Sequence, residues 1–232
     1  MAGGVYVAYT GAAAELAQLE VIANNIANAD TAGFLRDRTI FDTVLAAAMP
    51  YAGVSEGSID LSPGTPRLTG EPLHAALEEE GFFVVEGEGG EPLYTRRGDF
   101  RVDAQGRLVL PNGRPVLGEG GPIAIPAGQS ANVTGDGAVE TADGLVGRLQ
   151  VVRFTDPARL EKVGESLIRA LPGAAPETVD RPRVAVGFVE GSNVNLGAEI
   201  AALMQTARAF EAAMRGLRTN DEITQRLLGI DK

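Results

Sequence analysis

One histidine and a run of three glutamates are the residues of this sequence whose types could support catalysis. His74 is the only imidazole in the chain, so a serine nucleophile activated by histidine would have to use it. We expect His74 to begin a strand in the segment GEPLHAALEEEGFF, and no elbow motif places a serine beside it. Glu78, Glu79 and Glu80 could supply the two carboxylates of a glycosidase, but a charge run is typical of a solvated loop or strand end. Neither feature predicts an active site.

Glycine clusters, an acidic loop and the lack of cysteine give no better candidate for a bound group. The clusters at 87–90 and 118–121 are not followed by Lys-Ser or Lys-Thr and open no helix, so they predict hairpin turns rather than phosphate loops. The segment TGDGAVETADG lacks the alternating ligands and final glutamate of a calcium loop. Without cysteine, and with one histidine, a zinc or iron site is close to excluded. We therefore predict no catalytic residue, no cofactor and no metal, and expect that the protein is not an enzyme.

Charge and hydropathy restrict the kinds of partner. The net charge of −11 speaks against nucleic acid and anionic membranes, because both require a basic surface. No run of about 18 apolar residues is present, so we expect no direct membrane insertion. The N-terminus lacks the basic region and long apolar core of a cleaved secretory signal.

Proline divides the chain of 232 residues into two helical ends and a centre of short elements. All thirteen prolines lie between Pro50 and Pro182, and half of the thirty glycines lie between Gly53 and Gly128. Proline is excluded from helix interiors and is common in turns and at strand ends. We predict a terminal helical domain from 1–35 and 190–232, a linker over 36–72, and a central β domain over 73–189.

Apolar residues recur at heptad spacing in both terminal segments. In the first segment, steps of four and three residues alternate along Val5, Tyr9, Ala12, Leu16, Leu19, Ala23 and Ile26. In the last segment the pattern comprises Ile200, Leu203, Ala207, Phe210, Met214 and Leu217, and resumes in a shifted register at Ile223, Leu227 and Ile230. This pattern predicts two long helices, each with one apolar seam.

Two arrangements of these helices fit the pattern. Both helices could pack on a globular core, or they could pair with each other and with neighbouring chains. The seams are rich in alanine, which hides little surface per residue, so an isolated pair would be marginally stable. We therefore favour pairing that neighbouring subunits complete, and we expect the ends to be poorly ordered in the free monomer.

The central part predicts antiparallel β structure. Candidate strands are Phe82–Glu86, Leu93–Arg96, Phe100–Val102, Arg107–Leu110, Pro115–Leu117 and Ile123–Ile125. A long strand is expected over Leu145–Phe154, a short turn or helix follows it, and a last strand over 183–191 leads into the C-terminal helix. The predicted fold class is α+β, with the terminal helices paired as a coiled-coil-like inner domain and a central antiparallel all-β domain.

Both ends of the chain resemble one protein family. The segment VIANNIANADTAGF resembles the N-terminal signature of flagellar rod and hook proteins, and its matching residues are Asn24, Asn25, Ile26, Asn28, Thr31, Gly33 and Phe34. The segment EGSNVNLGAEIAALMQTARAFEAAMRGLRTNDEITQRLL resembles the C-terminal signature, with Ser192, Asn193, Asn195, Arg208, Phe210 and Glu211 at the matching positions. The central GFFVV and YTRRGDFRVDAQGRLV are similar to the β domain of that family. The short length and PVLGEGGPI are most similar to proximal-rod members, followed by distal-rod members.

The resemblance implies a structural subunit of the bacterial flagellar basal-body rod, a tubular shaft that transmits torque and encloses an export channel. The terminal helices would line the tube and the β domain would project outward. The implied partners are other rod and hook subunits, further copies of this chain, and the flagellar type III export apparatus. The implied location is the rod in the periplasmic space, reached in unfolded form and without a cleaved signal peptide.

Some positions depart from the family pattern. Ala32 replaces a common proline, Leu35 a usual lysine and His74 a usual aspartate, while Gly197 weakens the first turn of the last helix by about 1 kcal/mol relative to alanine. None of these departures lies on the two seams, so they leave the predicted fold unchanged.

The asparagines of the first signature are expected to set register in the assembly. Asn24, Asn25 and Asn28 lie beside the seam, where a free monomer would keep them in water and a packed tube would let them bond to neighbouring chains. Thr31 offers local backbone bonds, Gly33 a left-handed turn, and Phe34 an apolar contact. A plain polar helix terminus is the alternative interpretation.

Two other functions are weighed against this one. A β module on a coiled-coil stalk could bind carbohydrate or peptidoglycan, and would need an exposed platform built from Phe82, Phe83, Tyr94, Phe100 or Phe154. A hydrolase would need the acidic run at 78–80.

Overall fold

The computed structural model describes the backbone of residues 2–46 and 49–227, and the side chains of residues 9–38 and 58–219. The chain divides into two compact units. Unit 1 consists of Met1–Ala27, Asp37–Ser58 and Asn195–Lys232, and unit 2 of Asn28–Arg36 and Ile59–Val194. Each unit is therefore assembled from segments that lie far apart in the sequence.

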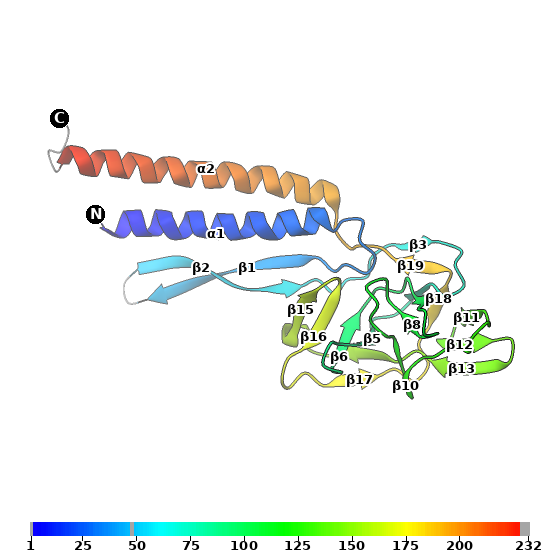
Figure 1. Cartoon of the computed structure of the whole chain (residues 1–232). Coiled ribbons are helices and arrows are strands. Elements are labelled where there is room, and N and C mark those ends of the chain that lie inside the picture. The colour runs from blue at the N-terminus through cyan, green and yellow to red at the C-terminus, as the bar shows by residue number, and fades with distance from the viewer. Residues whose placement is uncertain (1, 47–48, 228–232) are drawn as a thin grey trace. The chain divides into compact units, whose positions relative to one another are not determined.

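Unit 1 contains two long helices and a two-stranded ribbon. Helix α1 (Ala2–Ala27) packs against α2 (Leu196–Leu227) and against strand β1 (Asp37–Ala46), which pairs with β2 (Met49–Ile59). Figure 1 shows α1 lying between α2 and the β1–β2 ribbon. Both terminal helices are thus confirmed, and no helix within the described residues is long and apolar enough to cross a membrane.

The segment 36–72, which the sequence predicted as a linker, carries strands in the structure. It contains all of β1 and β2, together with β3 (Pro66–Leu68). The sequence TIFDTVL within β1 is rich in β-branched residues, which favour extended backbone. The terminal helices therefore share unit 1 with a β ribbon.

The buried side chains of the two helices do not follow the whole predicted seam. On α1, Ala12, Ala14 and Ile22 are buried, while the seam residues Tyr9 and Leu16 are 65% and 48% exposed. Ala23 and Ile200 of the predicted seams are also exposed, and Leu19, Ile26, Leu203, Phe210, Met214 and Leu217 are half-buried. The side chains of Val5 and Leu227 lie outside the described residues. Coiled-coil packing of α1 with α2 stays a prediction.

Unit 2 is built from short strands, and the pairings described within it are antiparallel. The largest sheet has six strands in the order β15-β16-β6-β5-β14-β17, a second has the order β11-β12-β13, and the rest are two-stranded pairs. After β3, the elements are β4 (Ala75–Leu77), β5 (Phe82–Glu86), β6 (Pro92–Thr95), β7 (Arg101–Val102), β8 (Leu108–Val109), β9 (Leu117–Gly118), β10 (Gly121–Pro122), β11 (Ala131–Val133), β12 (Ala138–Thr141), β13 (Gly144–Arg148), β14 (Val151–Phe154), a 3-10 turn η1 (Pro157–Arg159), β15 (Leu160–Gly164), β16 (Leu167–Ala170), β17 (Pro176–Thr178), β18 (Val184–Val186) and β19 (Phe188–Glu190).

Strand β5 lies at the centre of unit 2 and is buried on both faces. Phe83 and Val85 point into one apolar cluster, and Phe82 and Val84 into another, as the alternation of side chains along a strand requires. A strand covered on both sides is expected to be continuously apolar, as GFFVV is. The prediction of an antiparallel α+β fold with a strand at 82–86 is confirmed.

Four strand predictions need correction. The candidate Pro115–Leu117 forms only isolated bridges at Pro115 and Val116, and strand β9 begins at Leu117. The expected strand Leu145–Phe154 is divided into β13 and β14, because Gln150 donates its N–H to the carbonyl of Leu117 where the chain passes from one sheet to another. The expected strand over 183–191 is divided into β18 and β19 by Gly187, whose φ is 77°. The candidate Ile123–Ile125 forms only an isolated bridge, from Ala124 to Arg107.

Candidate assembly site at the two signature segments

The side chain of Asn25 ties the end of α1 to the start of β1. Its Nδ2 donates a hydrogen bond to the carbonyl oxygen of Asp37 (2.9 Å), and its Oδ1 accepts one from the N–H of Asp37 (3.0 Å). Asn25 is 1% exposed, so the expectation that the free chain keeps this side chain in water is wrong. A carboxamide carries one donor group and one acceptor group. The side chain of Asn25 therefore satisfies both the carbonyl and the N–H of Asp37, as the backbone of a paired strand does.

The other two signature asparagines are less buried. Asn24 is exposed, and its Nδ2 lies 3.2 Å from Oδ2 of Asp37. Asn28 is half-buried, and its carbonyl oxygen accepts the N–H of Thr31 (3.1 Å) while its Oδ1 accepts the Thr31 hydroxyl (3.2 Å). Asn28 and Thr31 therefore form a local turn directly after the end of α1, in unit 2.

Gly33 occupies a position that admits no side chain. Its φ is 63°, the left-handed conformation that the sequence predicted. A Cβ atom built there would lie 2.4 Å from the backbone nitrogen of Arg97 and 2.6 Å from its Cα. The N–H of Gly33 donates to the carbonyl oxygen of Glu190 (2.8 Å). Glycine at this position lets the N-terminal signature approach two distant segments of the chain.

Phe34 and Leu35 attach the same segment to the core of unit 2. Both are buried, and Leu35 belongs to the apolar cluster that includes Phe82 and Tyr94. Lys162 of β15 places its Nζ 4.2 Å from the centroid of the Phe34 ring and bonds to the carbonyl oxygen of Leu35. The leucine that replaces a usual lysine at position 35 is therefore a core residue.

Asn193 is the residue on which three segments of unit 2 converge. Its Oδ1 accepts the N–H of Arg36 (2.6 Å), and its Nδ2 donates to the carbonyl oxygens of Asp60 (2.9 Å) and Ser62 (2.8 Å). Its own N–H donates to the carbonyl oxygen of Phe34 (3.2 Å). We call segments 28–36, 59–65 and 188–194 the signature junction, because the inner ends of both signatures meet there.

Asn195 begins α2. Its Oδ1 accepts the N–H of Ala198 (3.0 Å), and its carbonyl oxygen accepts the N–H of Glu199 (3.0 Å), which makes Asn195 the N-cap. Just before it, Ser192 Oγ accepts the N–H of Val194 (3.3 Å). Farther along α2, the signature residues Arg208 and Glu211 are exposed and Phe210 is half-buried. The second signature thus begins with local hydrogen bonds. Its residues Arg208 and Glu211 face solvent in the single chain, whereas Glu199 in the first turn of α2 is buried.

The signature segments coincide with matches to known families. Residues 5–34 match a family described as flagella basal body rod protein, residues 76–141 the flagellar hook protein FlgE/F/G D1 domain, and residues 185–230 the flagellar basal body rod FlgEFG protein C-terminal region. The chain is 31% identical to the flagellar basal-body rod protein FlgG of Caulobacter vibrioides, over 94% of this chain and 95% of that protein. The chain belongs to the flagellar basal-body rod protein family. It is also 32% identical to the FlgF of C. vibrioides (90% and 89% covered) and 28% identical to a FlgG of Buchnera aphidicola (98% and 99% covered).

The signature junction of this rod-family protein also contains a buried ion pair that the sequence analysis missed. Arg96 Nη1 lies 3.2 Å from Oε2 of Glu190, and their side chains are 2% and 3% exposed. Burial raises the pKa of Glu190, although Arg96 and the N–H of Gly64 oppose this shift. A signal was present, because Glu190 ends the apolar run VAVGFVE, where an isolated charge predicts a specific partner.

In this rod-family protein, His74 forms a hydrogen bond and Glu79 of the acidic run forms an ion pair. His74 precedes β4, and its Nδ1 lies 2.9 Å from the hydroxyl of Thr69. Glu79 forms an ion pair with Arg183 (2.6 Å), which raises the pKa of that arginine. Among the described residues, no three His, Cys, Asp or Glu side chains are grouped so that they could hold a metal ion.

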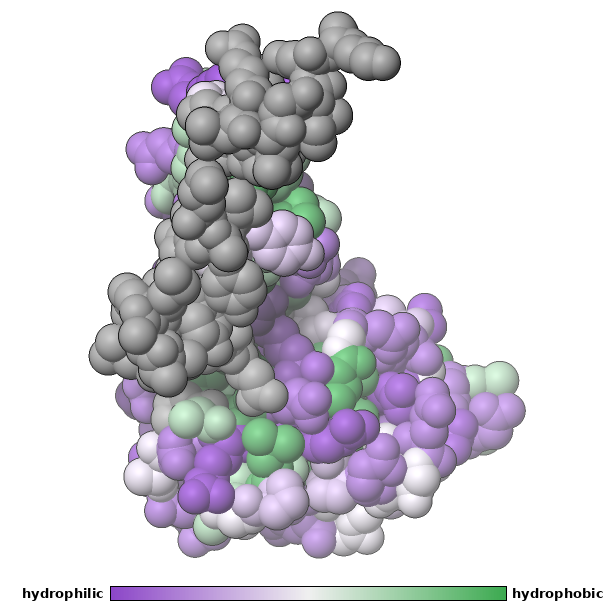
Figure 2. All heavy atoms as spheres, turned by 90° about the vertical axis from the view of Figure 1, so that its left-hand side faces the viewer, coloured by the Kyte–Doolittle hydropathy of each residue, from purple (hydrophilic) through white to green (hydrophobic). Residues whose placement is uncertain are grey.

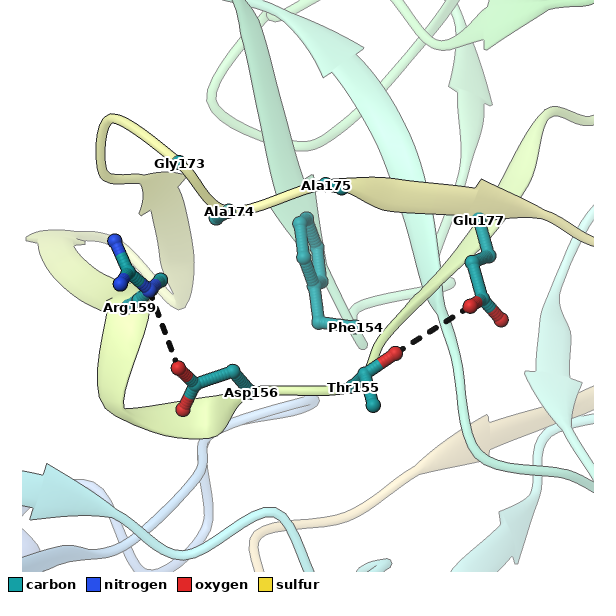
Figure 3. Close-up of a pocket in the computed structure, with 8 residues that line it drawn as sticks. All are labelled: Phe154, Thr155, Asp156, Arg159, Gly173, Ala174, Ala175 and Glu177. Carbon is teal, nitrogen blue, oxygen red and sulfur yellow. Dashed lines mark hydrogen bonds and ion pairs between the residues drawn. The ribbon is translucent and has the colours of Figure 1, made fainter.

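A surface pocket of about 230 Å³ lies beside η1 and β17 in unit 2. Figure 3 shows Phe154 on its wall, with Asp156 and Arg159 on one side and Thr155 and Glu177 on the other. Asp156 pairs with Arg159 (3.2 Å), and Glu177 Oε1 accepts the Thr155 hydroxyl (3.4 Å). Asp156 and Arg159 thus neutralise each other in this pocket, while Glu177 pairs with Arg153 (3.1 Å), which does not line it.

Proposed function

We propose that this chain is a non-enzymatic structural subunit of the bacterial flagellar basal-body rod, where copies polymerise into the tubular shaft that transmits torque and encloses the export channel. Its partners are other rod and hook subunits, further copies of itself, and the flagellar type III export apparatus. The site of action is the rod in the periplasmic space. The assignment to the proximal rod stays a prediction, because relatives named FlgF and FlgG match at similar identity.

The observation that carries this proposal is the apolar surface that unit 1 leaves uncovered. Tyr9 and Leu16 on α1, and Leu196, Ile200 and Met204 on α2, are large apolar side chains that are 45–65% exposed. Exposed large apolar side chains along both long helices are consistent with a surface that a protein partner covers. We propose that neighbouring subunits cover them in the rod.

We propose that different parts of the chain serve assembly and form the outer β domain. The terminal segments 1–35 and 190–232 form the assembly domain, and 73–189 form the central β domain. The ribbon β1–β2 belongs to the same compact unit as the helices and is expected to assemble with them. The signature junction holds the points at which the chain passes between the two units.

A single substitution tests the interface. Leu16→Glu places a charge on the uncovered surface, where assembly would have to bury it, so we expect loss of motility in a strain that depends on this gene. Leu145→Glu is the matched control, since Leu145 is also a leucine, is 65% exposed and lies in unit 2 on β13. We expect it to restore motility. If both variants restore motility equally, the proposed interface is wrong.

The alternative of a carbohydrate-binding module is not favoured by the structure. All five aromatic residues from which a sugar platform could be built are buried: Phe82, Phe83, Tyr94, Phe100 and Phe154. The face of unit 2 seen in Figure 2 is largely hydrophilic, with separate small hydrophobic areas. Aromatic rings that are packed in a core cannot stack on a sugar.

A further inference from the structure

We infer that Arg96 and Glu190 form a lock that makes the joining of the two family signatures conditional on a folded β domain. Arg96 is a positioning residue for assembly: it acts through Glu190, which in turn fixes the path of the N-terminal signature. The inference rests on the proposed function, and it adds a residue outside both signatures to the machinery of assembly.

Glu190 bonds to three segments at once. Its carboxylate accepts Arg96 Nη1 at Oε2 (3.2 Å) and the N–H of Gly64 at Oε1 (2.9 Å). Its carbonyl oxygen accepts the N–H of Gly33 (2.8 Å). Residues 33 and 190 come from the N-terminal and C-terminal family matches, and residue 96 from the central one. The three matched regions of the family therefore meet at one residue, Glu190, which binds Arg96 through its carboxylate and Gly33 through its backbone carbonyl.

Arg96 is held by the folded sheet. It directly follows β6, its Nη1 also donates to the carbonyl oxygen of Glu79 (3.2 Å), and its guanidinium lies 5.4 Å from the centroid of the Phe82 ring. The next residue, Arg97, provides the backbone against which Gly33 packs. Arg96 reaches this position only when the β5–β6 hairpin has formed.

Because both side chains are buried, the pair adds little net stability, but each partner is strongly unfavourable without the other. An ion pair that is withdrawn from water contributes little net stability, because desolvation offsets most of the attraction. A single buried charge without its partner is strongly unfavourable. Glu190 can therefore enter the junction as a carboxylate only when Arg96 is already there, and Gly33 has its acceptor only when Glu190 is in place.

Hydrogen exchange on the full-length protein tests whether the protection of the Gly33 and Gly64 amides depends on Arg96. In Arg96→Met, we expect the amide of Gly33 to exchange at least tenfold faster than in the wild type, and likewise the amide of Gly64. The amides of β5 and β6 should change less than twofold, because the apolar clusters around them are intact. Arg96→Lys keeps the charge and should recover part of the protection at both glycines. Arg153→Met is the matched control, since it removes an exposed ion pair to Glu177 (3.1 Å) from β14 of the same sheet, and it should leave both glycines protected.

The outcomes separate this inference from the proposed function. Equal loss of protection at the glycines and in β5 and β6 would show that Arg96 only stabilises the fold, and wild-type protection at Gly33 would overturn the lock. If Arg96→Met does not fold, the same measurement on Glu190→Gln replaces it, with the same local pattern expected and the same two results overturning the lock. The exchange assay needs no rod, so a failure of the wild-type gene to restore motility would count against the proposed function alone.

Discussion

The side-chain amide of Asn25 and the backbone of Asp37 exchange two hydrogen bonds, of 2.9 and 3.0 Å, in a place where Asn25 is almost fully withdrawn from water. This pairing joins the end of α1 to the first residue of β1 within unit 1. One asparagine of the N-terminal signature is therefore bonded within the chain itself, whatever contacts the signature makes between chains.

Replacing Asn25 by alanine should therefore destabilise unit 1. The change removes both hydrogen bonds between the buried side chain of Asn25 and the half-buried backbone of Asp37, at a cost of about 2 kcal/mol. Urea unfolding followed by the helical circular dichroism signal measures this, because α1 and α2 are the two long helices of the described chain. Asn24→Ala is the control, and its exposed site predicts a change below about 0.5 kcal/mol. Equal effects of the two changes would contradict the assigned role of Asn25.

Gly33→Ala should lower the free energy of unfolding by more than the strain of the left-handed conformation alone. The φ of 63° penalises any Cβ by roughly 1–2 kcal/mol, and the approach of 2.4 Å to the nitrogen of Arg97 adds a clash with backbone that cannot rotate away. Gly113→Ala separates the two terms, because Gly113 has a φ of 84° and nothing within 4 Å of its Cβ position. We expect the first variant to lose at least about 1 kcal/mol more free energy of unfolding than the second.

Asn193→Ala tests the convergence of segments at the signature junction. The three shortest side-chain hydrogen bonds of Asn193 are each worth about 1 kcal/mol net, so we expect their removal to cost about 3 kcal/mol. Asn112→Ala is a suitable comparison, since Asn112 is exposed and its Nδ2 donates to Glu165 at 2.8 Å. A thermal shift of Asn193→Ala no larger than that of Asn112→Ala would refute the junction as described.

The buried carboxyl of Glu190 should make the free energy of unfolding depend on pH. Burial raises its pKa above the ordinary value of 4.5, so the folded protein binds this proton more tightly than the unfolded chain does. The resulting contribution to stability is complete below pH 4.5 and is lost as the pH rises through the raised pKa. Glu190→Gln removes this dependence, and the variant minus wild-type difference in free energy of unfolding should become more positive across that window. A constant difference would show that the pKa is not raised.

Local pattern in the sequence was enough to predict the elements whose conformation depends on near neighbours. The apolar run at 82–86 predicted β5, the lack of proline at both ends predicted α1 and α2, and glycine at position 33 predicted a left-handed turn. The signature residues at both ends predicted the family that the relatives show. These features are encoded locally, because backbone period, side-chain branching and glycine act over a few residues.

Only the tertiary structure decided which residues meet. Asn193 bonds to Arg36, which lies 157 positions away, and Glu190 pairs with Arg96, which lies 94 positions away. No periodic pattern connects such residues, and a polar side chain in the sequence does not indicate whether water or a distant backbone will satisfy it. Asn25 is a further example. From the sequence alone it predicts a solvated helix end, but in the folded chain its side chain is buried and bonds to the backbone N–H and carbonyl of Asp37. The sequence thus determined the two terminal helices, strand β5 and the family. The ribbon β1–β2 and the partners of the buried polar groups depended on the closing of loops that only the complete fold brings about.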